Sequence, residues 1–347
     1  MAHIWVRAEE RAMEQRVALA PEGVTALRAA GFSVTVEESP DRAIAIAEYA
    51  KAGARIMPAF SWMDAPSDVI VLGLKELNED GPDLRHRHIM FGHAYKGQPD
   101  GPALLARFKR GGGTLYDLES LVDENGRRVA AFGYWAGFAG AAVGVMAWCA
   151  QQTESPLCAI GSYASKDELL GTLREMLGRQ RFKTIVIGAK GRVGSGAVEL
   201  CRTLGLPVTE WDMAETAHGG PFPEILDHQM FVNCILAAPG VPLFVPKDAA
   251  ERARKLSVIA DVSCDPGSDY NPIPVSKRST TFDAPIVRVA ASPQPLDVMA
   301  IDNLPSMLPL ESSFDYAAQL LPSLLQLSNI HTGVWARAHQ IFESHLK

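Results

Sequence analysis

The sequence predicts an α/β protein made of two domains, each a parallel sheet flanked by helices. Short apolar runs alternate with helical patterns along most of the chain. The run VIVLGL (Val69–Leu74) is wholly apolar, as is typical of a central parallel strand. A second α/β unit opens at Thr184, where an apolar strand leads into a glycine-rich turn and a helix.

The first third of the chain supplies the first sheet. Pro21 stands in the first turn of a helix and Gly31 lies just past its end, which are the positions that these residues prefer. The predicted strands are His3–Val6, Ser33–Val36, Val69–Leu74, Ile89–Gly92 and Thr114–Tyr116, and the predicted helices are Pro21–Ala30, Ile44–Ala52 and Leu104–Phe108.

A long, almost uncharged segment, Val129–Ala150, separates the two units. Its high glycine and alanine content favours a buried helix over a membrane span. The following residues 153–168 have little periodicity and are interpreted as a linker. The second sheet is predicted to contain strands Thr184–Ile187, Val208–Trp211, Met230–Ile235, Val258–Val262 and Ile286–Val289.

Two helices, Ser312–Gln326 and Thr332–Ser344, are predicted at the end of the chain. We therefore expect one domain from residues 1–133 plus 310–347 and another from residues 134–309. Ligands of open parallel sheets bind at the carboxyl ends of the strands, so the active site is expected in a cleft between the domains.

Composition excludes several classes of protein. The 347 residues carry a net charge of -7 with dispersed basic residues, which does not favour nucleic-acid binding. The five cysteines form no CxxC pair, so neither a disulfide framework nor a zinc site is expected. His86 and His88 lack further ligands nearby, and no metal is predicted. The charged N-terminus does not resemble a signal peptide, and a cytoplasmic location without membrane association is expected.

The glycine-rich turn predicts a dinucleotide site on a Rossmann-like fold. Glycines allow the main chain to approach a pyrophosphate closely, and the helix that follows, predicted from Ala197 to Leu204, offers free N–H groups to it. Asp212 ends the next strand, at the spacing expected of an acid that binds ribose hydroxyls and favours NAD over NADP. The turn reads GxxGxxG instead of the usual fingerprint, with its glycines at Gly188, Gly191 and Gly194.

Two side chains suited to proton transfer follow neighbouring strands of the first unit. Lys75 comes directly after VIVLGL, and His93 follows the next strand. Histidine titrates near neutral pH, and lysine does so when desolvated or close to other cations. Taken alone, each residue is more often structural or solvated, but their shared position at strand ends favours catalysis. Arg7, Arg11 and Arg16 cluster after the first strand and are candidates for holding carboxylates.

These segments also resemble a known family. GLKE (Gly73–Glu76), FGHAYKGQ (Phe91–Gln98), IGAKGRVGSGA (Ile187–Ala197) and IDNLPSMLP (Ile301–Pro309) are similar to the lysine-forming, NAD-dependent saccharopine dehydrogenases of fungi, within the alanine dehydrogenase and transhydrogenase group. The resemblance covers nearly the whole chain. It implies a two-domain fold and an NAD-dependent oxidation of saccharopine to lysine and 2-oxoglutarate.

The resemblance also implies the roles of individual residues. Lys75 and His93 correspond to the acid–base pair. The implied substrate-binding residues are Arg16, Glu76, Lys96, Glu119, Arg128 and Asp302, and the implied cofactor-binding residues are Gly188, Gly191, Arg192, Val193, Gly194, Asp212 and Cys234. Val193 replaces a cysteine of the fungal pattern, so a disulfide to Cys234 cannot form here.

The function predicted from the sequence is therefore an oxidoreductase of amino-acid metabolism, with NAD as cofactor and a small molecule as substrate. A monomer or a small homo-oligomer is expected. Two alternatives stay open at this point. One is a dehydrogenase of another amino acid or opine-like compound, and the other is a catalytically silent NAD-binding module.

Overall fold

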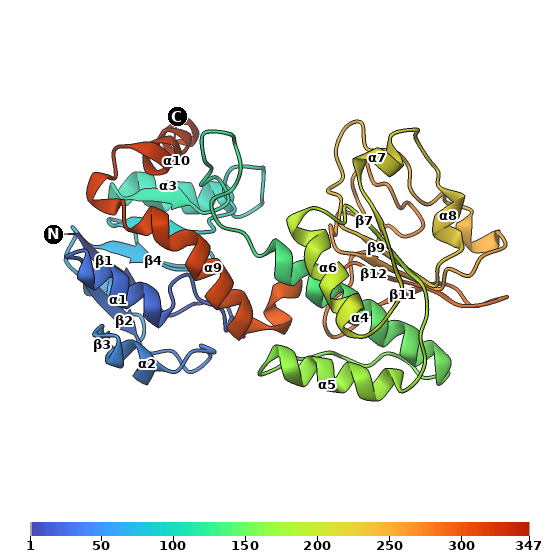
Figure 1. Cartoon of the computed structure of the whole chain (residues 1–347). Coiled ribbons are helices and arrows are strands. Elements are labelled where there is room, and N and C mark those ends of the chain that lie inside the picture. The colour runs from blue at the N-terminus through green and yellow to red at the C-terminus, as the bar shows by residue number, and fades with distance from the viewer. Residues whose placement is uncertain (1, 347) are drawn as a thin grey trace. The chain divides into compact units, whose positions relative to one another are not determined.

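The computed structural model describes residues 2–346 and divides the chain into two compact units (Figure 1). Unit 1 comprises residues 1–131 and 309–347, and unit 2 comprises residues 132–308. The sequence-based division was residues 1–133 with 310–347 against 134–309. The C-terminal helices α9 (Pro309–Leu324) and α10 (Gly333–His345) return to the N-terminal strands of unit 1, as the red and blue ribbons show.

Unit 1 contains a six-stranded, fully parallel sheet in the order β3-β2-β1-β4-β5-β6. Its strands are β1 (His3–Val6), β2 (Ser33–Glu37), β3 (Arg55–Met57), β4 (Ile70–Leu72), β5 (Arg87–Met90) and β6 (Thr114–Asp117). The chain runs outward from β1 through β2 to β3 and then crosses to β4. The segments after β1 and β4 therefore meet at a switch point, where open α/β sheets bind ligands.

Helices cover the sheet of unit 1. These are α1 (Pro21–Ala29), α2 (Ile46–Lys51) and α3 (Gly101–Gly111), together with α9 and α10. Phe108 of α3 and Phe342 of α10 pack with Val71 and Met90 in one apolar cluster. His88, on β5, lies edge-on to Trp62 and Phe108 in this core. Burial of its imidazole lowers the pKa of His88 well below its usual value, so a neutral, structural histidine fits this position.

Unit 2 contains a six-stranded sheet in the order β11-β12-β10-β9-β7-β8. The predicted Ile286–Val289 strand is observed as β11, and it runs antiparallel to β12, so this sheet is not wholly parallel. The parallel strands are β7 (Thr184–Ile187), β8 (Val208–Trp211), β9 (Met230–Asn233), β10 (Val258–Asp261) and β12 (Leu296–Met299), and β11 spans Val287–Ala290.

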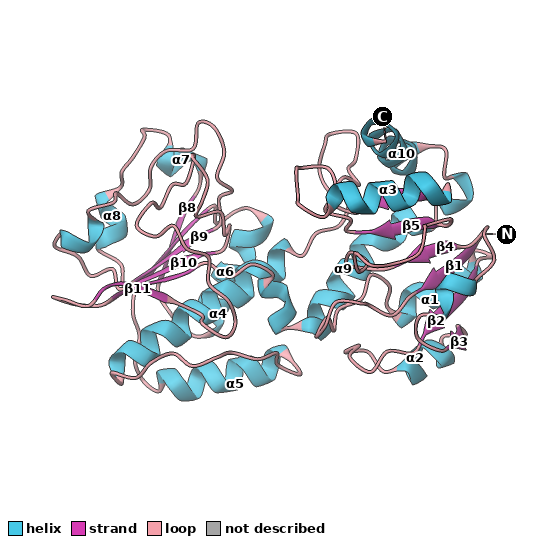
Figure 2. Ribbon diagram, turned by 180° about the vertical axis from the view of Figure 1, so that it is seen from behind, coloured by secondary structure: helices cyan, strands magenta, loops and turns pink. Residues whose placement is uncertain are grey.

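The two faces of this sheet are packed by alternate residues of each strand. Val186 and Val232 join the cluster formed with α4 (Gly133–Gln152), α5 (Lys166–Leu177) and α6 (Arg192–Thr203). Ile185 and Phe231 face the opposite side, in the cluster with α8 (Pro223–Leu226). Figure 2 shows α4, α5 and α6 together on one side of the strands. Both faces are covered, which explains why the central strands β7 (TIVI) and β9 (MFVN) are mostly apolar and buried throughout.

Helix α4 is the predicted apolar segment. It is long and apolar enough to span a membrane, but 72% of its most apolar window is buried inside the protein. A Cβ at Gly137 would lie 1.8 Å from the Val193 carbonyl oxygen, and one at Gly196 would lie 2.0 Å from that of Tyr134. These glycines let α4 and α6 pack with their backbones in close contact, so the composition of α4 serves helix packing.

Several elements differ from the sequence-based prediction. The end of the predicted linker is helical, because Ser165 caps α5 by accepting a hydrogen bond from the Glu168 amide at 3.2 Å. Strands β3 and β12 were not predicted, and β4 is shorter than the apolar run VIVLGL. Two short helices, α7 (Met213–Thr216) and α8, were also missed because their apolar patterns are too brief to show a period.

Candidate functional site

Lys75 and His93 lie at the same edge of the sheet in unit 1. Strands β4 and β5 are parallel neighbours, and each of these residues follows the carboxyl end of its strand. The chain turns sharply at His93, whose φ of 47° lies in the left-handed region. The structure therefore places both residues at the same edge of this sheet, and their action as an acid–base pair stays a prediction.

Lys75 is partly buried among charged groups. Burial lowers the pKa of its ammonium, and the positive charges of Arg16 and Arg11 lower it further, while Glu14 and Glu76 act in the opposite direction. A lysine whose pKa is lowered can both lose and regain a proton closer to neutral pH. These surroundings therefore suit Lys75 to proton transfer.

Arg16 forms a buried ion pair with Glu14. The guanidinium donates to the carboxylate from Nε at 2.8 Å and from Nη2 at 2.6 Å, and both side chains are 2% exposed. The hydrogen bonds and positive charge of Arg16 lower the pKa of Glu14 against the effect of its burial. Glu14 thus fixes the direction of Arg16 at this edge, and the binding of a substrate carboxylate by Arg16 stays a prediction.

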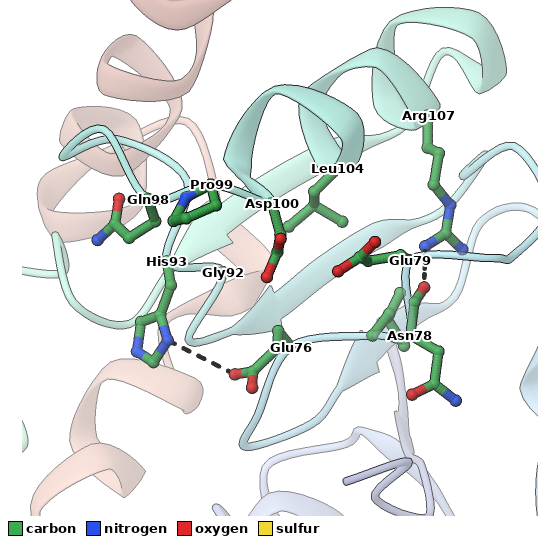
Figure 3. A pocket seen from close by; sticks show the side chains of 11 residues that line it. Glu76, Asn78, Glu79, Gly92, His93, Gln98, Pro99, Asp100, Leu104 and Arg107 are labelled. Carbon is green, nitrogen blue, oxygen red and sulfur yellow. Dashed lines mark hydrogen bonds and ion pairs between the residues drawn. The ribbon is translucent and has the colours of Figure 1, made fainter. Parts of the chain in front are cut away.

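Glu76 connects two of these groups. Its Oε2 lies 3.5 Å from His93 Nδ1 and its Oε1 lies 3.4 Å from Arg11 Nη1. Figure 3 shows the ion pair between His93 and Glu76 beside a cavity of about 430 Å³, which carboxylates of Glu79 and Asp100 also line. Repulsion and a hydrogen bond from Asp100 raise the pKa of the Glu79 carboxyl. The cavity is lined by three carboxylates and by the basic side chains of Arg107 and His93, so acids outnumber bases and suit it to a cationic group.

Lys96 and Glu119 form a third pair, with Nζ and Oε1 2.6 Å apart. The Glu119 amide donates to Asp117 Oδ1 at 2.8 Å, so the last residue of β6 holds the loop that carries Glu119. Asp117 is only 1% exposed, and its Oδ2 makes no hydrogen bond of normal geometry. Burial raises the pKa of Asp117 to about 6, although nearby amides of Glu119 and Gly92 favour its charged form.

The remaining charged candidates have different surroundings. Arg7 was predicted as a candidate for holding a carboxylate, and this prediction is wrong. Its buried guanidinium donates to the carbonyl oxygens of Ala8 and Lys75 and pairs with Glu9, so it is not placed to clamp a substrate. Arg128 is exposed on the loop before unit 2. Asp302 lies in unit 2 after β12, where its Oδ1 accepts from the neighbouring Asn303 amide at 2.8 Å.

In unit 2 the glycine-rich turn follows β7 as predicted. Gly188 has a φ of 84°, which a residue with a side chain rarely adopts. A Cβ at Gly194 would lie 2.1 Å from the Gly188 carbonyl oxygen. Helix α6 begins at Arg192, five residues before the predicted start at Ala197, so Arg192, Val193 and Gly194 form its first turn.

The start of α6 fits a pyrophosphate. Gly191 is the N-cap, supplies no side-chain cap and is exposed together with Arg192. The first N–H groups of a helix have no partner within the helix, and the first turn of α6 contains no acidic side chain to satisfy them. The backbone of the turn therefore presents hydrogen-bond donors and positive partial charge to an anion.

Asp212 and Cys234 lie on either side of this turn. Asp212 follows β8 and accepts from the amides of Met213 at 2.9 Å and Lys190 at 3.0 Å, so it caps α7 and also supports the glycine turn. Cys234 follows β9, and its amide donates to the Ile187 carbonyl at 3.0 Å. Burial raises the pKa of the Cys234 thiol, which fits a protonated, unreactive side chain.

Sequence reasoning missed three acids of unit 1, namely Glu9, Glu14 and Asp117. Asp117 directly follows a predicted strand, so the rule that selected Lys75 and His93 also applies to it. Glu9 and Glu14 lie between the arginines that follow the first strand. The alternation of charge in that segment was the available signal, because buried arginines require anionic partners.

Comparisons with known proteins agree with this architecture. The family described as alanine dehydrogenase/PNT, N-terminal domain, matches residues 5–139. A saccharopine dehydrogenase [NAD(+), L-lysine-forming] of Neurospora crassa is 47% identical, over 97% of this chain and 95% of that protein. The protein of the same name from Yarrowia lipolytica is 46% identical, over 98% and 96%. A solved L-alanine dehydrogenase has the same fold, with a TM-score of 0.68 at 19% identity over 99% of each chain.

Proposed function

The chain belongs to the family of NAD-dependent, L-lysine-forming saccharopine dehydrogenases, and we propose that it oxidises saccharopine to L-lysine and 2-oxoglutarate. The reaction consumes NAD and water, and the same groups serve the reverse condensation. The observation that carries the proposal is the pair Lys75 and His93, which follow adjacent parallel strands among ionised side chains.

The reaction needs proton transfers at three stages. The secondary amine loses a proton as its carbon is oxidised, water adds to the resulting imine, and the departing lysine amine gains a proton. The NAD cofactor supplies the hydride acceptor. Lys75, with its lowered pKa, is suited to accept a proton near neutral pH, and His93 is suited to exchange one with water or the amine. Glu76 Oε2 lies 3.5 Å from His93 Nδ1 and would orient the imidazole.

Saccharopine carries three carboxylates and two amino groups, so it requires both cationic and anionic contacts. We assign Lys96 and Arg128 to the carboxylates, since guanidinium and ammonium groups are the strongest partners for such anions. We assign Arg16 to the same task, for which a substrate carboxylate would have to share its buried guanidinium with Glu14. The acidic cavity next to Glu76 suits the ammonium group of the lysine portion. We assign Glu119 and Asp302 to orienting the substrate and the groups that bind it.

NAD binding is assigned to unit 2. The exposed start of α6 would hold the pyrophosphate through Gly191, Arg192 and their neighbours, and Asp212 would accept hydrogen bonds from the ribose hydroxyls. Asp212 already receives two main-chain N–H groups, so its orientation is set before a cofactor binds. A carboxylate at that place disfavours the additional phosphate of NADP.

The test is an assay of NADH oxidation with 2-oxoglutarate and a panel of amino acids. The proposal expects L-lysine to give the highest kcat/KM, with saccharopine as the product identified by mass spectrometry. A higher kcat/KM with another amino acid would favour the alternative of a related opine-like substrate. Tight NADH binding without turnover on any substrate would instead indicate a catalytically silent module.

A further inference from the structure

An ion pair lies directly beneath the main chain of Lys75. Glu9 accepts hydrogen bonds from the amides of Leu74 at 2.7 Å and Lys75 at 2.9 Å. Arg7 donates from Nη2 to the carbonyl oxygen of Lys75, and its Nη1 lies 3.4 Å from Glu9 Oε2. Both polar groups of the Lys75 main chain are therefore held by side chains that follow β1.

This pair is buried and closely fitted. The Arg7 side chain is 0% exposed and that of Glu9 is 9% exposed. A Cβ at Gly73 would lie 2.4 Å from Arg7 Nε and 2.6 Å from Nη2, so the guanidinium packs against the main chain because residue 73 is a glycine. Removing one partner of such a pair leaves a buried charge without compensation and is strongly destabilising. Arg7 and Glu9 therefore keep each other in place against the main chain of Lys75.

The ladder between β4 and β5 ends just before Lys75. The Phe91 amide donates to the Leu74 carbonyl at 2.9 Å, and this bond joins the segments that follow the two strands. Lys75 itself lies one residue further, where sheet pairing no longer fixes the main chain. At Lys75 the hydrogen bonds of the sheet are thus replaced by hydrogen bonds to the side chains of Arg7 and Glu9.

We propose that Arg7 and Glu9 are positioning residues that act through Lys75, an inference that rests on the proposed function of Lys75. By fixing the amide and the carbonyl of Lys75, they hold its side chain in the direction that proton transfer requires. Displacement of a reacting group by about 1 Å can lower a rate by roughly 100-fold. Neither residue needs to contact the substrate for this effect.

The chain offers a matched control in the neighbouring residue, Glu10. Its carboxylate accepts from the Asn78 amide at 2.8 Å, so it also holds the main chain of the segment after β4. Asn78 lies three residues beyond Lys75 and is exposed. Glu10→Gln changes the same chemical group as Glu9→Gln, without touching the main chain of Lys75.

The experiment is a double-mutant cycle on the full-length protein, with kcat measured at saturating substrates. Glu9→Gln leaves only one oxygen to accept from two amides, so we expect kcat to fall roughly 10- to 100-fold. In a Lys75→Met background the same change should alter the residual kcat less than twofold. Glu10→Gln should leave kcat unchanged in both backgrounds.

Gly73→Ala provides a second route that removes no charge and serves if Glu9→Gln does not fold. Its methyl group would displace the guanidinium of Arg7, and its effect on kcat should likewise disappear when Lys75 is absent. Equal losses of kcat in the presence and absence of Lys75, for a folded variant, would overturn the inference. If Lys75→Met itself keeps near-normal kcat, the proposed catalytic role of Lys75 fails instead.

Discussion

In unit 1 the segments after β1, β4, β5 and β6 carry ionisable side chains, whereas in unit 2 the segment after β7 carries glycines. Lys75 and His93 follow strand ends in the first sheet, where Asp117 is the last residue of β6, and Gly188 and Gly191 follow β7 in the second. The two sheets share a switch-point topology. What differs is whether side chains or the main chain face the ligand.

This difference has a physical reason. Proton transfer needs groups whose pKa values are adjusted by burial and by neighbouring charge, as at Lys75. Binding a pyrophosphate needs close approach and several N–H donors, which glycines and a helix start provide without ionisable groups. We therefore expect substitutions in unit 1 to affect turnover and substitutions in the glycine turn to affect cofactor binding.

The largest expected effect is on turnover, from the acid–base pair. Lys75→Met and His93→Gln should each lower kcat by roughly 10²–10⁴-fold, because each removes a proton-transfer group. The double variant should lose much less than the product of the two factors, since the residues serve the same steps. Steady-state kinetics of the three variants decides this, and multiplicative losses would show that the residues act independently.

The next largest effect is a pH dependence of the free energy of unfolding, caused by the buried carboxyl of Asp117. Its pKa is raised from the usual 3.8 to about 6 by burial, which corresponds to at most about 3 kcal/mol. Well below pH 3.8 the carboxyl is protonated in both the folded and the unfolded state. Between pH 4 and 6 the unfolded state loses its proton first, so ionisation of Asp117 lowers the free energy of unfolding as pH rises, and the cost is complete above pH 6.

Asp117→Asn should remove this dependence. The free energy of unfolding of the wild type, relative to the variant, should fall between pH 4 and 6, as measured by denaturant titration at several pH values. Asp261→Asn in unit 2 is the comparison: burial also raises the pKa of Asp261, against hydrogen bonds from Asn233 at 2.9 Å and Ser263 at 2.8 Å, so a dependence of the same sign is expected there. A constant difference for Asp117→Asn across that range would show that its carboxyl is not perturbed.

A smaller, selective effect on cofactor affinity is expected from the glycine turn. Gly194→Ala places a methyl group 2.1 Å from the Gly188 carbonyl oxygen and should distort the turn, raising the Kd for NADH by roughly tenfold or more. Gly171→Ala, in α5, is a suitable control because a Cβ there meets nothing within 4 Å. Fluorescence titration with NADH distinguishes the variants, and unchanged affinity in Gly194→Ala would separate the turn from cofactor binding.

The smallest effect is a change of cofactor preference. Asp212→Ser removes the carboxylate that would repel a 2′-phosphate, so the ratio of kcat/KM for NAD to that for NADP should narrow. The variant also loses part of the cap of α7, so the melting temperature should be measured alongside. Equal or better kcat/KM with NADP in the wild type would contradict the assignment of Asp212.

The sequence predicted most of the fold because the central strands of both sheets, such as β4 and β7, lie in apolar runs and glycines mark the critical turn. It did not predict α5, although Leu169, Leu173 and Leu177 recur at helical spacing, because the aperiodic residues before it were extended to Glu168 as a linker. It also did not predict the antiparallel direction of β11, which depends on pairing with β12. Strand direction within a sheet is decided by tertiary contacts that no local pattern records.

The sequence also predicted the main residues of the candidate site, but not the buried ion pairs that hold them. Position after a strand selected Lys75 and His93, and the glycine turn selected the start of α6. The ion pair of Arg16 with Glu14 and that of Arg7 with Glu9 were not predicted, because a charged residue in a loop is ordinarily solvated. Only packing shows that Arg7 is buried against the main chain at Gly73 and is unavailable to a substrate.

The division of work between the two units is tested most directly by measuring NADH affinity and kcat on Lys75→Met. The account predicts an unchanged Kd for NADH, by fluorescence titration, together with a kcat lowered by at least roughly 100-fold. An intact melting temperature would establish that the variant is folded. Near-normal kcat in this folded variant, or a loss of NADH affinity that accounts for its lost activity, would contradict the account.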